Sequence, residues 1–250
     1  MNEVTKKDQA LMDGQSEAPM GFEEEEEGEM IIPRVKVIQT LSPERKEGTA
    51  AEGDIINSLT QDKLNGKTFI PVFKFNNNIR WTPRADGGGI ACQARNGKNG
   101  VEADGKELLC AKCRKNEFDN TKTGKDAIPT CTKYINFFGF IEGERIPMIL
   151  SFSKTNYNEG KKLYSLAKVT MQNMWNNGYE IKEKLISKNS NEWYIITANP
   201  VGKTSEEDRA FAIGLFKNFR NTSIDYDIDE NQGSTTETGA TNEEVESSEF

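Results

Sequence analysis

Histidine is absent from this 250-residue sequence, and so are long apolar runs. Without histidine, metal sites that mix Cys and His ligands are excluded, as is imidazole as a catalytic base. No apolar segment approaches the roughly 18–20 residues that span a bilayer. The N-terminus, MNEVTKKDQALMDG, also lacks the apolar stretch of a secretory signal. We therefore expect a cytoplasmic protein with no membrane partner.

Enzyme signatures are scarce as well. We find no paired-carboxylate motif, and the loop Asp86–Gly89 lacks the Lys-Ser/Thr of a phosphate-binding P-loop. The Cys-x-x-Cys at Cys110 and Cys113 is not preceded by the proline of the zinc deaminase signature. These absences favour a binding protein without catalytic activity.

The charges are segregated along the chain. The net charge of the whole sequence is −8, from 32 basic and 40 acidic residues. Residues 1–30 hold two basic and ten acidic residues, and residues 221–250 hold nine acidic residues and no basic one. The remaining 30 basic and 21 acidic residues give residues 31–220 a net charge of +9. A basic region of this kind is typical of nucleic-acid binding.

The composition predicts three regions. Residues 1–30, with a run of five glutamates from Glu23 to Glu27, and residues 221–250, rich in Ser, Thr, Gly and acidic residues, are expected to be disordered tails. Residues 31–220 are expected to form the folded body.

The body reads as short strands with two helices. We predict a strand at 34–39, a short helix or turn at 53–59, and two strands within 68–81 around a polar turn at 76–78. A further strand is predicted at 90–94, hairpins at 134–152 and 179–201, and helices at 156–170 and after Thr204, taken as an N-cap with Glu207. Mostly short connections favour a mainly β fold with a few helices, an OB-fold-like antiparallel barrel.

The four cysteines are evenly spaced. Cys92, Cys110, Cys113 and Cys131 form the pattern C-x17-C-x2-C-x17-C. In a reducing compartment this pattern favours a metal over disulfides. We predict that the four thiolates bind a structural Zn²⁺ in an insertion at 90–133. The alternative is four free thiols, with a redox pair at Cys110 and Cys113.

Basic residues are interleaved with aromatic residues, the combination that single-stranded nucleic acids require. We expect roughly half of these aromatic residues in the core, with Trp81 and Tyr157 better placed for stacking than Phe138 or Phe152, and Phe73 and Phe75 facing away from Lys74. The nucleic-acid-binding residues that we predict are Lys74, Arg80, Trp81, Arg84, Arg95, Lys112, Arg114, Lys133, Lys154, Tyr157 and Lys161.

The chain resembles bacteriophage single-stranded DNA-binding, or helix-destabilising, proteins. The resemblance rests on the acidic tail that ends in Phe250, the four cysteines, and the segments IPRVKVIQ, RWTPRADGG and ILSFSKT. It implies an OB-fold, a protein that coats single-stranded DNA during phage replication or recombination, and a location in the host cytoplasm. It also implies that the tail recruits a polymerase, helicase or primase through Phe250 and covers the DNA groove when DNA is absent.

One alternative stays open. The same features suit a zinc-containing transcription accessory factor whose basic body binds RNA polymerase. Binding to oligo(dT) without sequence preference separates the first function from the second.

Overall fold

The computed structural model describes residues 31–83, 86–118, 121, 129–188 and 190–221. All of them except Ile31 belong to the unit that begins at Ile32. The strands in this part of the chain are β1 (Arg34–Val37), β2 (Ile55–Asn57), β3 (Thr68–Trp81), β4 (Ile90–Ala94), β5 (Asn99–Glu102), β6 (Glu107–Leu109), β7 (Cys131–Ile141), β8 (Pro147–Ser153), β9 (Asn177–Lys188) and β10 (Asn191–Lys203). The α-helices are α2 (Pro43–Glu47), α3 (Tyr157–Val169) and α4 (Glu206–Phe219), and short 3-10 turns are η2 (Cys110–Lys112), η3 (Arg114–Asn116), η5 (Lys154–Asn156) and η6 (Met174–Asn176).

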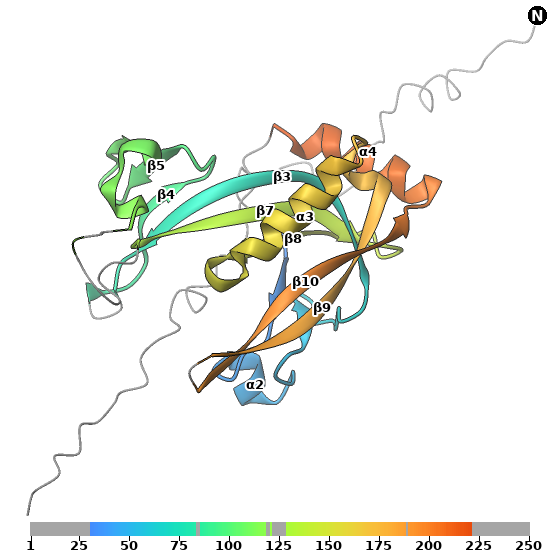
Figure 1. The fold of residues 1–250 in the computed structure, drawn as a ribbon, viewed down its shortest axis with the longest axis horizontal. Coiled ribbons are helices and arrows are strands. Elements are labelled where there is room, and N and C mark those ends of the chain that lie inside the picture. The colour runs from blue at the N-terminus through green and yellow to red at the C-terminus, as the bar shows by residue number, and fades with distance from the viewer. Residues whose placement is uncertain (1–30, 84–85, 119–120, 122–128, 189, 222–250) are drawn as a thin grey trace, which may run out of the picture. The chain divides into compact units, whose positions relative to one another are not determined.

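The long strands β3 and β7 form the centre of one mixed sheet (Figure 1). The strand order is β2-β1-β8-β7-β3-β4-β5-β6, and β9 joins β3 while pairing with β10. The edge of β3 opposite β7 is shared, because β9 pairs with its first two residues and β4 with the segment from Asn78 to Trp81. Pro71 lies in the gap between these two partners, where the missing N–H of proline is tolerated.

The prediction of a mainly β fold with a few helices is confirmed, but the predicted antiparallel barrel is wrong. The path of the described strands ends at β2 on one side and β6 on the other, and the sheet is not closed. It is also mixed, because β1 and β8 are parallel. The physical reason is the branching at β3: its two ends carry different partners, β9 and β4, and these diverge (Figure 1).

Each face of the central sheet has its own hydrophobic core. The first core lies beneath α3 and joins Phe137 and Phe152 to Leu163 and Ala167 of that helix. The second lies beneath α4 and joins Phe138 and Phe140 of β7 to Ala212 and Leu215. The alternation of side chains along β3 and β7 divides the aromatic residues between the two cores.

Most predicted elements are present, but two elements and one helix cap differ. The segment 53–59 contains the strand β2 instead of the predicted short helix or turn, and 68–81 is one continuous strand instead of two. The N-cap of α4 is Ser205, not Thr204: the Ser205 hydroxyl accepts a hydrogen bond from the backbone N–H of Asp208 at 3.0 Å. Thr204 instead donates its hydroxyl to the carbonyl of Trp175 at 2.7 Å.

Candidate functional site

The first candidate surface lies on the side of the sheet that α3 covers. Lys74 of β3 pairs with Phe137 of β7, whose ring lies in the core beneath α3. Paired residues in neighbouring strands project from the same face of a sheet. Lys133 precedes Phe137 by four residues in the same strand, so it projects from that face too. Lys74 and Lys133 therefore lie on the α3 side, as Lys74 was expected to lie opposite its aromatic neighbours.

Phe73 confirms that division. Its ring stacks on Phe138 in the opposite core, with centroids 4.9 Å apart, and meets Phe216 of α4 at 6.3 Å. The aromatic residues beside Lys74 in sequence are therefore packed under α4, while the Lys74 ammonium is on the other face. Phe138 and Phe152 are fully buried, as expected of core residues.

Two tyrosines and two lysines alternate along one side of α3. Tyr157, Lys161, Tyr164 and Lys168 are separated by four, three and four residues, so they form one line along the helix. We call this line the Tyr–Lys stripe. The buried residues Gly160, Leu163 and Ala167 form the adjacent line that packs on the sheet. The stripe is therefore the part of α3 that borders its buried face.

Cations lie over both rings of the Tyr–Lys stripe. The Lys161 ammonium is 5.0 Å from the centroid of Tyr157. The ammonium groups of Lys74 and Lys168 are 4.8 and 5.8 Å from the centroid of Tyr164. Both rings are half-buried against the core, and burial lowers the pKa of Lys74. The surface thus combines π faces with positive charge, which is what nucleobases and phosphates require.

Two predicted residues continue the basic surface at the ends of β7 and β8. Tyr134 pairs with Ser153, so Lys133 and Lys154 are the next residues in the two strands. Both side chains are exposed, although surrounding atoms desolvate the Lys154 ammonium and lower its pKa. This places Lys133 and Lys154 at the same end of the β7–β8 pair.

The other predicted nucleic-acid contacts are elsewhere. Arg95, Lys112 and Arg114 are exposed in the segment that contains β4, β5, β6, η2 and η3. Arg80 forms an ion pair with Glu102 at 2.7 Å, and Trp81 beside it is half-buried. Arg84 and Phe250 lie outside the described residues.

The predicted contacts include Tyr157 and Lys161 of this stripe, but not Tyr164 and Lys168. The helical spacing of four, three and four residues was the signal that could have identified all four. Lys74 was also predicted as a contact, but its position over Tyr164 could not be read from the sequence, because it depends on how α3 packs across the sheet.

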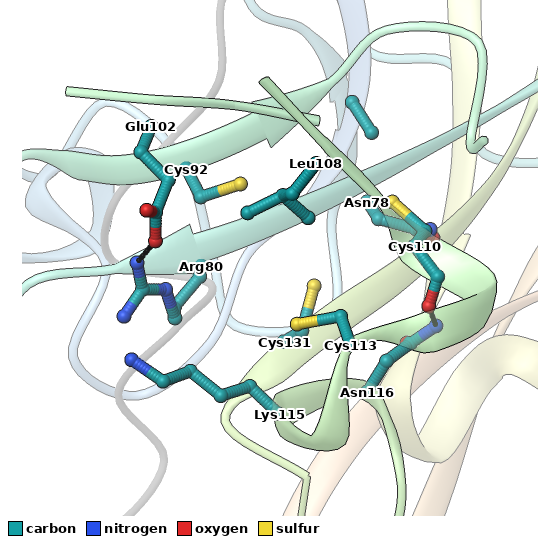
Figure 2. Close-up of a pocket in the computed structure, with 11 residues that line it drawn as sticks. Asn78, Arg80, Cys92, Glu102, Leu108, Cys110, Cys113, Lys115, Asn116 and Cys131 are labelled. Atoms are coloured by element: carbon teal, nitrogen blue, oxygen red, sulfur yellow. Dashed lines mark hydrogen bonds and ion pairs between the residues drawn. The ribbon is translucent and has the colours of Figure 1, made fainter. Parts of the chain in front are cut away.

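The four cysteines come from distant segments and line one pocket (Figure 2). Cys92 in β4 and Cys131 at the start of β7 both pair with Arg80, on its two sides. Cys110 and Cys113 belong to a tight turn in which the Cys113 N–H donates to the Cys110 carbonyl at 3.2 Å. The turn is tied to the residue before β5 and to η3, because the Cys110 N–H donates to the Lys98 carbonyl and the Asn116 amide donates to the Cys110 carbonyl.

The pocket is tightly packed on one side. A side chain at Gly100 would place its Cβ 3.0 Å from the Cys92 sulfur and 3.2 Å from Leu108, so these two side chains would have to shift slightly to admit one. Across the described ranges, no three His, Cys, Asp or Glu side chains are arranged to hold a metal ion as they stand. Desolvation raises the pKa of Cys131 to about 11 and also raises that of Cys92. Both thiols are therefore neutral at pH 7 unless a cation binds them.

Comparison with known families adds one finding. The model of the Pam3 phage gp34-like protein family matches residues 2–224. The chain belongs to this phage protein family. The match covers the Tyr–Lys stripe and all four cysteines, and it stops before most of the acidic C-terminal segment. No curated protein and no solved structure matches the chain. None of the described helices is long and apolar enough to cross a membrane.

Proposed function

We propose that this member of the Pam3 phage gp34-like family is a non-enzymatic protein that binds single-stranded DNA and coats it during phage replication or recombination. The observation that carries the proposal is the Tyr–Lys stripe, in which each ring has at least one ammonium within 6 Å of its centroid. One side of each ring packs on the core, so bases would stack on the other side of Tyr157 and Tyr164 as the lysines over these rings move to contact the phosphates.

The chemistry of the stripe favours single strands over duplex DNA. Stacking on a tyrosine requires an unpaired base whose faces are accessible, and each stacked base contributes about 1–3 kcal/mol. The two rings are about 10 Å apart along the axis, given seven residues at roughly 1.5 Å rise. A single strand that follows α3 can therefore reach both rings, with the net charge of +9 in residues 31–220 attracting its backbone.

The acidic C-terminal segment would act on the same surface. Residues 221–250 carry nine acidic side chains and end in Phe250. In this proposal the segment competes with DNA for the basic surface, and Phe250 binds a replication partner such as a polymerase, helicase or primase. The proposed binding surface is thus basic, and the segment that would compete for it is acidic.

The test replaces one lysine of the stripe and compares the effect on DNA binding with that of replacing a lysine elsewhere. Lys168→Ala should weaken binding to oligo(dT) and reduce the slope of log K against log salt by about 0.7, the contribution of one phosphate contact on a single strand. Lys46→Ala is the control, because Lys46 is exposed on α2. Equal effects of both substitutions would refute the assignment to α3. Co-purification with RNA polymerase without oligo(dT) binding would favour the accessory-factor alternative.

A further inference from the structure

None of the residues that line the cysteine pocket belongs to α3, and the pocket has a chemistry of its own. We infer that Cys92, Cys110, Cys113 and Cys131 bind one Zn²⁺ through four thiolates, and that this ion holds the segment from Ile90 to Phe118 onto the ends of β3 and β7. The inference rests on the side chains that line the pocket and on the packing of that segment, and it is independent of the proposed function.

The four thiols converge on one pocket. Four cysteines are present in the whole chain, and all four line the same pocket although they span 40 residues of sequence. Cys92 and Cys131 are brought there by strand pairing on either side of Arg80, and Cys110 and Cys113 by a hydrogen-bonded turn. Two of the cysteines come from a Cys-x-x-Cys turn, a common source of thiolate ligands for zinc, and the other two from the strands on either side of β3.

The segment from Ile90 to Phe118 has almost no apolar core of its own. From Ile90 to Phe118, the buried apolar side chains are Ala94 and the cysteines Cys92 and Cys110. The strands β4, β5 and β6 have five, four and three residues. Three short strands with so little buried apolar surface need another source of stability, and a structural metal supplies it.

The pocket also contains charged side chains beside the thiols. A Zn²⁺ bound by four thiolates has a net charge of −2, which a buried site must compensate. Arg80, Lys115 and Glu102 line the pocket (Figure 2), so its charged side chains sum to +1 and offset part of this charge; Arg80 lies between Cys92 and Cys131 in the pairing of the strands. The Arg80–Glu102 ion pair keeps the guanidinium at this position. With four thiolate ligands the coordination shell is closed, so the ion is structural and leaves no site for a catalytic water.

Binding requires the thiols to turn toward a common centre. The described side chains do not form a metal-ready group as they stand, and Leu108 lines the pocket beside Cys92. All four cysteines line the same pocket, so zinc binding requires the segment around them and their side chains to close toward a common centre in it. The competing possibility is a redox disulfide between Cys110 and Cys113, which would leave Cys92 and Cys131 as free thiols.

The experiment measures metal content and free thiols in the full-length protein. The protein is reconstituted with zinc under reducing conditions, desalted, and analysed by elemental mass spectrometry and thiol titration after denaturation. We expect about one zinc per chain, four free thiols in the denatured chain, and a zinc content at least tenfold lower in Cys110→Ser and in Cys131→Ser. Folding of the variants is checked by circular dichroism.

The matched control is Leu108→Ala, which changes the lining of the same pocket without removing a ligand. It should keep about one zinc per chain. Reconstituted protein without zinc, or with two free thiols and one disulfide, would overturn the inference whether or not the variants fold. Loss of zinc in Leu108→Ala equal to that in Cys110→Ser would also overturn it, because the ligands would then not be the cause.

Discussion

The ring of Tyr164 offers the sharpest perturbation of the proposed DNA surface. It is half-buried, its inner side packs on the core beneath α3, and the ammonium groups of Lys74 and Lys168 lie 4.8 and 5.8 Å from its centroid. Tyr164→Leu keeps an apolar side chain against the core and removes the aromatic face. If one base stacks on this ring, the substitution removes about 1–3 kcal/mol of binding free energy, or roughly 5- to 150-fold in affinity.

The assay is a fluorescence titration of the full-length variant with oligo(dT) at fixed salt, with thermal unfolding measured in parallel. Tyr164→Phe serves as the matched variant, because it keeps the ring and loses only the hydroxyl. We expect Tyr164→Phe to bind within about twofold of the parent, since the stacking face is unchanged. A folded Tyr164→Leu protein that binds like the parent, or a Tyr164→Phe protein that loses as much affinity, would refute the reasoning.

Three further predictions concern stability and regulation. Gly160→Ala should lower the free energy of unfolding by about 1–3 kcal/mol, because its Cβ would lie 2.7 Å from that of Phe152, whereas Gly214→Ala, with open space around it, should raise it by about 0.5–1 kcal/mol; denaturant unfolding measures both. Ser205→Ala should lower the melting temperature through loss of about 1 kcal/mol of N-cap stabilisation. Deleting residues 221–250 should tighten oligo(dT) binding at low salt, and unchanged affinity would exclude competition by this segment.

The sequence predicted local structure well where local signals agreed. The β7–β8 hairpin, the β9–β10 hairpin and the helices α3 and α4 follow from alternation, helical spacing and turn residues. The segment 68–81 shows where local signals fail. Asn76–Asn78 is typical of a turn, yet Asn77 and Asn78 are buried in β3, and Asn78 donates its amide to the Gly97 carbonyl at 3.0 Å. Pairing with β7 along the whole strand overrides the local preference.

The candidate sites could also be predicted from the sequence only in part. Even spacing was enough to expect the four cysteines together, and the structure gathers all four around one pocket. The contact between Lys74 and Tyr164 joins residues 90 positions apart, and it depends on which face of the sheet α3 covers. No local pattern specifies that choice, and the same long-range pairing decides that the sheet stays open.

The most direct test of the central claim is a titration of the full-length protein with oligo(dT) and with duplex DNA over a range of salt concentrations. The account predicts tighter binding to oligo(dT), with an affinity that falls steadily as salt rises because lysines contact the phosphates. Absence of oligo(dT) binding, or equal binding to duplex DNA, would contradict the account.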